Sequence, residues 1–154
     1  MKAKHKNLAR EQLDKTLEQF LPLKTVVSPR KGWVRATRDA LGMSGEQLAK
    51  RLNTNKQRVS RIEQDEKPGN ITVKTLKNVA EALDCEFVYG FAPKQTLEKT
   101  VRNQARIIAE KRMSQSDQMM RLEKQELSEN EKYIALENLI TDIINTMPRS
   151  LWDK

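Results

Sequence analysis

Apolar residues recur at helical spacing along most of the chain and predict a succession of amphipathic helices. Residues 8–21 carry leucines and a phenylalanine on one helical face, and this pattern stops at Pro22. Residues 22–32 contain two prolines and a glycine, so they are predicted to form a linker. The apolar face of the first helix needs a partner that covers it.

Four or five short helices are expected in residues 32–84, which are predicted to fold as one bundle. Gly42 ends the first of them, and Ser44 with Gln47 three residues later forms a capping-box pattern at the start of the second. Asn53 is a residue type that tolerates the left-handed conformation of a tight turn. Asn55 can then cap the next helix.

The helix that follows Asn55 has a narrow apolar side. Between residues 56 and 64 only Val59 and Ile62 are apolar, at positions i and i+3. The other faces include four side chains that can form hydrogen bonds, namely Lys56, Gln57, Ser60 and Arg61. This helix is therefore expected to bury one side and to present the rest.

Residues 85–92 change to a pattern typical of a strand, with Phe87, Tyr89 and Phe91 at period two. Nothing else in the chain is strongly strand-like. The predicted partner is therefore the same strand of a second subunit, paired antiparallel about a two-fold axis. The alternative is an extended segment packed on its own domain.

Residues 93–154 are predicted to be a helical region that serves dimerisation or partner binding. A long helix begins near Leu97, and the capping-box pair Ser128 and Glu131 predicts the start of the last helix. A wide apolar stripe on that last helix stops at Pro148, so the helix is expected to be packed. The residues predicted to make dimer contacts are Phe87, Tyr89, Phe91, Ile140 and Ile143.

Composition favours a small core with helical arms over one large globule, because only 37% of the 154 residues are hydrophobic. The net charge of +8 is concentrated in residues 30–61, where nine Lys or Arg accompany two acidic residues. Residues 98–154 hold ten basic and ten acidic residues, which is the balance of a solvated surface. The basic segment is therefore the surface expected to face phosphates.

The chain contains few of the residues and motifs that catalysis, metal binding or membrane insertion require. It has one cysteine, Cys85, and one histidine, His5, and it shows no catalytic carboxylate pair, Ser-His-Asp set or phosphate loop. No run approaches the roughly 20 apolar residues of a membrane span, and the basic start lacks the apolar centre of a secretory signal. We therefore expect a cytoplasmic, nucleoid-associated protein that is not an enzyme and needs no cofactor or metal, with Cys85 buried as inert packing.

Two helices joined by a turn of three or four residues, the second polar and basic on its outward side, form the helix-turn-helix arrangement. Its second helix lies in the DNA major groove. Since Gln can bond adenine and Arg or Lys can bond guanine, the predicted base-reading residues are Lys56, Gln57, Ser60 and Arg61. Phosphate contacts fix the register without reading sequence. They are predicted for Ser44, Lys50, Arg51, Asn55 and Arg58.

Residues 33–83 resemble the phage-repressor-like or Xre class of helix-turn-helix domains. The matching residues are Leu41-Gly42, Leu48-Ala49, Asn53-Thr54-Asn55 with Asn53 where the class usually has glycine, and Ser60-Arg61-Ile62-Glu63. The resemblance implies a mainly α fold, here with N- and C-terminal helical extensions. It also implies that Arg38 pairs with Glu63 while facing a phosphate. The same resemblance implies base reading by Lys56, Gln57 and Arg61.

Further stretches resemble the family called mobile mystery protein A, and this likeness spans most of the chain. The stretches are LAREQLD, GWVRATRDALGMSGEQLAKRL and LDCEFVYGFAPK. Members of that family resemble antitoxin-type regulators associated with a Fic-domain partner. The resemblance therefore implies a toxin–antitoxin or mobile-element setting, which neither composition nor periodicity shows.

Two functions are compatible with these patterns. The first is an autoregulatory, antitoxin-like repressor that reads a palindromic operator as a homodimer. The second is an inhibitor whose terminal helices sequester a partner enzyme, with DNA binding secondary. The two differ in whether the apolar stripes of the terminal helices are covered or left exposed. RNA binding is disfavoured because the basic surface lacks the stacking aromatics of RNA-binding modules.

Overall fold

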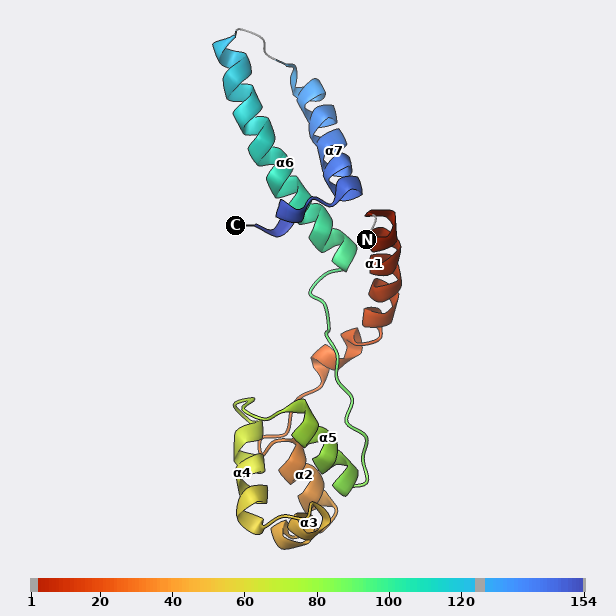
Figure 1. The fold of residues 1–154 in the computed structure, drawn as a ribbon, viewed down its shortest axis with the longest axis vertical. Coiled ribbons are helices and arrows are strands. Elements are labelled where there is room, and N and C mark those ends of the chain that lie inside the picture. Colours follow the sequence, from red (N-terminus) through yellow and green to blue (C-terminus); the bar gives the residue numbers. More distant parts are fainter. Residues whose placement is uncertain (1–2, 124–126, 154) are drawn as a thin grey trace. The chain divides into compact units, whose positions relative to one another are not determined.

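The structure is a computed structural model that describes residues 3–123 and 127–153. Within these ranges the chain forms helices and connecting segments without a β-strand, so the mainly α prediction is confirmed. The chain divides into two compact units (Figure 1). One consists of residues 25–90. The other joins residues 1–24 to residues 91–154, so the N-terminal helix belongs with the C-terminal region.

Four helices form the unit of residues 25–90. They are α2 Trp33–Ala40, α3 Gly45–Arg51, α4 Lys56–Glu66 and α5 Val73–Ala82. The side chains of Ser44, Asn55 and Thr72 each accept a hydrogen bond from the backbone N–H three residues later, and so cap α3, α4 and α5. The Gln47 side chain also accepts from the Ser44 N–H at 2.7 Å. The predicted capping box is therefore confirmed.

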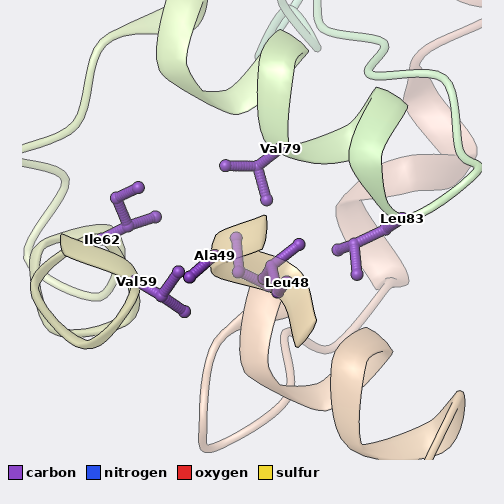
Figure 2. Close-up of a cluster of buried hydrophobic side chains, with 7 residues drawn as sticks. Leu48, Ala49, Val59, Ile62, Val79 and Leu83 are labelled. Carbon is purple, nitrogen blue, oxygen red and sulfur yellow. The ribbon is translucent and has the colours of Figure 1, made fainter. Parts of the chain in front are cut away.

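One apolar cluster holds these four helices together. Figure 2 shows Leu48 and Ala49 of α3 at its centre, between the α4 side chains and those of α5 and its C-cap. The buried residues of the cluster are Val34, Leu48, Ala49, Val59, Ile62, Val79 and Leu83. Since burial of one such aliphatic side chain contributes about 1.5–3 kcal/mol, two residues suffice to hold the narrow side of α4. The side chains of Lys56, Gln57, Arg58, Ser60, Arg61 and Gln64 on the same helix stay exposed.

Residues 85–92 do not form the predicted strand. The N–H of Cys85 donates to a carbonyl of α5 at 2.8 Å, and the described chain offers no neighbouring strand beyond it. The ring of Phe87 stacks on Tyr89 with centroids 5.8 Å apart, and Lys77 Nζ lies 5.7 Å from the Tyr89 centroid. A single strand leaves its backbone groups unpaired, so side-chain contacts with its own domain take over. Cys85 is exposed, so the prediction of a buried cysteine is wrong.

The described residues of the other unit form three helices and two short 3-10 helices. They are α1 Ala3–Glu18, η1 Leu21–Thr25, α6 Leu97–Leu122, α7 Glu129–Thr146 and η2 Arg149–Trp152. The first helix thus begins earlier and ends earlier than the predicted range 8–21, because Leu21 opens the 3-10 turn around Pro22. α6 and α7 pack side by side as a hairpin (Figure 1). At the start of α7, the predicted capping box of Ser128 and Glu131 is confirmed.

The hairpin and η2 enclose a second apolar cluster. Its buried residues are Val101, Ala105, Ala109, Ile140, Ile143, Ile144 and Leu151. η2 closes this cluster with the side chain of Leu151 and with the backbone carbonyl of the same residue, which accepts from Gln104 Nε2 at 2.8 Å. The last helix is therefore packed, as predicted, but against its own chain.

The five residues predicted to make dimer contacts separate into two groups. Ile140 and Ile143 are 0% and 1% exposed inside their own unit, so they offer no surface to a second subunit. Tyr89 and Phe91 are exposed, whereas Phe87 is half-buried. The sequence pattern could not separate these groups, because a stripe shows that a face is covered but not what covers it.

Two polar contacts fix α1 to the start of α6. Arg10, the one charged residue buried in the described chain, donates from Nε to Glu98 Oε2 at 2.6 Å. The Asp14 carboxylate accepts from the backbone N–H groups of Leu97 and Glu98 at 2.6 and 3.1 Å. Those N–H groups lack partners within α6, and the negative charge of Asp14 suits a helix N-terminus.

The apolar stripe of α1 is only partly covered. Leu8 and Leu13 on α1 are 55% and 47% exposed, and Leu23 on η1 is 53% exposed. The polar contacts of Arg10 and Asp14 therefore position α1 while leaving several leucines in contact with solvent.

Candidate nucleic-acid interface

The turn between α3 and α4 sets the direction of the second helix. Asn53 follows the C-cap Leu52 and has a φ of 54°, in the left-handed region. The N–H of Thr54 donates to the Ala49 carbonyl at 2.9 Å and satisfies one of the last carbonyls of α3. The prediction that Asn53 supports a left-handed turn is therefore confirmed.

The side chains predicted to read bases lie on the exposed surface of α4, where the structure places Lys56, Gln57, Ser60 and Arg61. On the opposite side of the helix, Val59 and Ile62 are 2% and 4% exposed. Within the described residues, none of the four polar side chains makes a hydrogen bond or an ion pair. The amide donor and acceptor of Gln57 and the N–H groups of Arg61 are therefore available for hydrogen bonds outside the domain.

Arg38 of α2 and Glu63 of α4 form a two-point ion pair. Arg38 Nε donates to Glu63 Oε1 at 2.6 Å, and Nη2 donates to Oε2 at 3.3 Å. Nη1 of the same guanidinium donates to the Met43 carbonyl at 2.8 Å. Both side chains of the pair are nearly buried, at 12% and 11% exposed, and the hydrogen bond to Glu63 raises the pKa of the Arg38 guanidinium. Because all three nitrogens already donate inside the domain, Arg38 has few N–H groups left for a phosphate.

A second carboxylate of α4 caps α2, which sequence analysis did not predict. Glu66 Oε1 accepts from the Trp33 N–H at 2.7 Å, and Oε2 accepts from the Val34 N–H at 3.0 Å. Gly32 has a φ of +83°, and a Cβ there would lie 2.7 Å from Glu66 Oε2. The sequence signal for this contact was Gly32 at the N-cap position of α2, because glycine has no side chain with which to cap the helix itself.

These two contacts anchor the C-terminal half of α4. Glu63 and Glu66 both bind α2, whereas the first turns of α4 make no side-chain contact of this kind in the described structure. The polar side chains at Gln57 and Arg61 are thus carried by a helix that is fixed at one end and along one side. A rigid support of this kind limits the orientations that those side chains can adopt.

The residues predicted to bind phosphates mostly flank this helix. Ser44 Oγ accepts from the Gln47 N–H at 3.1 Å, and Asn55 Oδ1 accepts from the Arg58 N–H at 2.8 Å. The Ser44 hydroxyl proton and the Asn55 amide nitrogen remain available as donors. Lys50 and Arg58 are exposed, and their side chains have no partner within the described residues.

Arg51 differs from the other predicted phosphate contacts because it binds another helix. Its Nη1 donates to the Ala82 carbonyl at 3.0 Å, at the end of α5. A positive charge at a helix C-terminus is favourable. Arg51 also lines a shallow polar hollow of 460 Å³ with Leu52, Asn78 and Glu81. It therefore has a structural role that sequence analysis did not predict.

Other kinds of site find no support in residues 3–123 and 127–153. No cluster of three or more His, Cys, Asp or Glu side chains there could hold a metal ion. In the same ranges, every helix is too short or too polar to cross a membrane.

Comparison with protein families gives an independent result for the same segment. Residues 34–89 match the helix-turn-helix family. Searches of curated proteins and of solved structures found no match. The matched residues include α3, the turn at Asn53 and the whole of α4. This match supports a DNA-binding regulator of the Xre type, with residues 34–89 as its helix-turn-helix domain.

Proposed function

We propose that the protein is a sequence-specific transcriptional repressor that places α4 in the major groove of its operator. The observation that carries this proposal is the free polar face of α4, on a helix whose opposite side and far end are fixed. Gln57 can offer a donor and an acceptor to adenine, and Arg61 can offer paired donors to guanine. A good bidentate pair of this kind discriminates against the wrong base by about 1–3 kcal/mol.

Donors beside α4 supply the contacts that would hold the domain on the duplex. Ser44 and Asn55 each retain a side-chain donor at the start of a helix, and Lys50 and Arg58 are exposed cations. Contacts of this type bind the phosphates of any sequence and fix the register in which α4 meets the bases. The concentration of basic residues in residues 30–61 supports the same orientation.

The proposed active form is a homodimer on a palindromic operator. One α4 reads only a few base pairs, whereas two copies related by a two-fold axis read two half-sites. Their recognition helices should then lie about 34–36 Å apart, one turn of DNA. The setting proposed is the cytoplasm, with the protein on the nucleoid and repressing its own operon.

Footprinting of the DNA upstream of its own gene tests this function. Titrations then compare the protected operator, single-base variants of it and random duplex at several salt concentrations. Gln57→Ala and Arg61→Ala should each lower the operator-to-random affinity ratio by about 5-fold to 100-fold. Gln64→Ala is the matched control, because Gln64 is an exposed glutamine at the anchored end of the same helix. A ratio unchanged in both test variants would contradict base reading by α4.

A second candidate function is favoured by the exposed leucines of the N-terminal region. Leu8, Leu13 and Leu23 leave a partly bare apolar face on α1 and η1, which fits a surface for a partner protein. The resemblance to antitoxin-type regulators identifies a Fic-domain toxin as the partner to test. Leu8→Glu with Leu13→Glu should abolish a complex with a Fic-domain protein encoded beside this gene, and should leave operator binding intact. If the double variant still binds both the Fic-domain protein and the operator, this candidate is contradicted.

A further inference from the structure

The face of α1 that packs on α6 and α7 is polar at its centre. α1 lies beside the start of α6 and the end of α7 (Figure 1). The residues of α1 that are not exposed recur at spacings of three and four, as expected for one helix face, and are Ala3, Asn7, Arg10, Asp14 and Leu17. Within the described chain, no residue of α1 joins the apolar cluster of the hairpin. α1 is therefore held mainly by polar contacts.

Arg10 forms the centre of this face. Its Nε donates to Glu98 Oε2 of α6 at 2.6 Å, and its Nη2 donates to Asn7 Oδ1 at 3.0 Å. Nη1 lies 4.0 Å from the sulfur of Met147, at the C-cap of α7. The Arg10 side chain is 8% exposed, whereas that of Glu98 is 54% exposed. One guanidinium thus joins α1 to both helices of the hairpin, through an ion pair that is open to solvent on the Glu98 side.

Asp14 supplies part of the cap of α6 from outside that helix. The N-cap side chain of Thr96 accepts from the Lys99 N–H at 3.1 Å. The Asp14 carboxylate accepts from the N–H groups of Leu97 and Glu98, although Asp14 and Leu97 are 83 residues apart in the sequence. Since the contact to Glu98 is exposed, water can hydrate the first N–H groups of α6 when the carboxylate leaves. α6 therefore needs no rearrangement to release α1.

A third polar contact lies where the chain enters and leaves the helix-turn-helix unit. Lys24 Nζ, in η1, donates to the Pro93 carbonyl at 2.5 Å. The helix-turn-helix unit consists of residues 25–90, so this bond joins the segments that flank it. With α1 docked, the chain connects that unit to the hairpin unit at both of its ends. With α1 released, residues 91–96 alone connect it to the hairpin.

We propose that α1 is a clasp that opens without unfolding the α6–α7 hairpin, and that its opening leaves the helix-turn-helix unit connected to the hairpin by one segment in place of two. Salt screens the Arg10–Glu98 pair and the contact of Asp14 with the N-terminus of α6, so rising ionic strength opens the clasp. The hairpin keeps its apolar cluster, because α1 contributes nothing to it in the described structure.

A released α1 also loses its own helical hydrogen bonds. It has 16 residues, and an isolated helix of about this length is marginal in water. Backbone amides of α1 therefore become accessible to solvent exchange each time the clasp opens. The inference goes beyond the proposed function, since it concerns the hairpin unit and does not depend on base reading by α4.

Hydrogen exchange of the full chain, followed by mass spectrometry without DNA, tests the clasp. Amides of α1 should exchange at least about 10-fold faster in about 1 M salt than in about 0.05 M salt, because the contacts that hold α1 are screened. Amides of residues 105–109 and 140–144, inside the apolar cluster of the hairpin, should change by less than about 2-fold. An α1 that is insensitive to salt, or equal acceleration of α1 and the hairpin, would overturn the proposal.

Substitutions at constant low salt test the same contacts. Arg10→Ala and Asp14→Ala should each accelerate exchange in α1 by about 5-fold to 30-fold and leave residues 105–109 unchanged, because each removes one polar contact of the clasp. Glu11→Ala is the matched control, since Glu11 is an exposed acid of the same helix whose carboxylate meets the exposed Lys15 at 3.5 Å. Equal exchange in Asp14→Ala and Glu11→Ala would refute the role of Asp14. Loss of protection in the hairpin together with α1 would show one cooperative core and overturn the clasp.

Nitrogen-15 relaxation tests the consequence for the helix-turn-helix unit. The ratio of the rotational correlation time of residues 97–122 to that of residues 33–82 should rise by at least about 1.3-fold in the Arg10→Ala, Asp14→Ala double variant, because a single flexible connection restrains the unit less. Glu11→Ala should keep the wild-type ratio. An unchanged ratio in a double variant whose α1 has lost protection would refute the clasp as a second connection.

Discussion

The Glu66 carboxylate at the end of α4 occupies the space that a side chain at Gly32 would need. Its two oxygens accept hydrogen bonds from the first N–H groups of α2, at Trp33 and Val34. A Cβ on Gly32 would lie 2.7 Å from one of these oxygens. The glycine therefore allows α4 to act as the cap of α2, and the position of α4 depends on that contact.

Gly32→Ala should destabilise the helix-turn-helix domain by about 2–4 kcal/mol, because the positive φ becomes strained and the carboxylate must leave two N–H groups unpaired. Gly42→Ala is the matched control, since Gly42 has a φ of +64° and nothing within 4 Å of its Cβ position. It should cost only about 1 kcal/mol. Urea unfolding of both variants measures the difference, and equal free energies of unfolding would show that the contact with Glu66 is unimportant.

Arg38→Ala and Glu63→Ala should each lower the free energy of unfolding by about 3 kcal/mol, because either change removes one member of a nearly buried ion pair. The other acidic neighbour of Arg38, Asp39 at 3.1 Å, is 40% exposed and therefore compensates only weakly. Arg35→Ala provides the comparison on the same helix. Arg35 is half exposed and lies 3.9 Å from Asp39, so its loss should cost less than about 1 kcal/mol. Thermal melts equal to wild type for both Arg38→Ala and Glu63→Ala would refute the role of this pair in holding α4.

Lys50→Ala and Arg51→Ala should have different effects, although the two residues are neighbours on α3. Loss of Lys50 should leave stability unchanged and reduce the slope of log affinity against log salt by about one unit, as expected for one phosphate contact. Loss of Arg51 should cost about 1 kcal/mol of stability, because the Ala82 carbonyl loses its hydrogen bond. Salt-dependent DNA titrations and urea unfolding separate the two. An Arg51→Ala protein with wild-type stability would leave Arg51 with only its predicted phosphate role.

Asn53→Gly should raise the melting temperature slightly, and Asn53→Ala should lower it. The φ of 54° at this position is free of strain for glycine, tolerated by asparagine and unfavourable by about 1 kcal/mol for alanine. The protein with glycine at position 53 should therefore be the most stable, the wild type with asparagine intermediate, and the alanine variant the least stable. Differential scanning calorimetry of the three proteins gives the order directly, and an alanine variant as stable as wild type would contradict the strain at this turn.

Sequence alone predicted the features that depend on neighbouring residues. The capping boxes at Ser44 and Ser128, the left-handed turn at Asn53 and the narrow apolar side of α4 all follow from residues within one or two helical turns. Such signals are local, because a cap or a helical stripe is encoded by spacing along the chain.

The strand predicted for residues 85–92 failed because its evidence was local too. Alternating aromatic residues fit a pleated edge, but a strand exists only where a second strand satisfies its backbone groups. The described chain supplies none, and Tyr89 instead meets Phe87 and Lys77.

Tertiary structure alone decided which surfaces are covered and which are free. The stripe of α7 indicated burial, but only the packing showed that Ile140 and Ile143 are enclosed by their own chain while Tyr133 on the same face is exposed. In the same way, no sequence pattern indicated a contact for Glu66, which the fold brings to the start of α2, 33 residues away in sequence. Periodicity fixes the direction in which a side chain points relative to its own helix, whereas its partner depends on contacts between residues far apart in the chain.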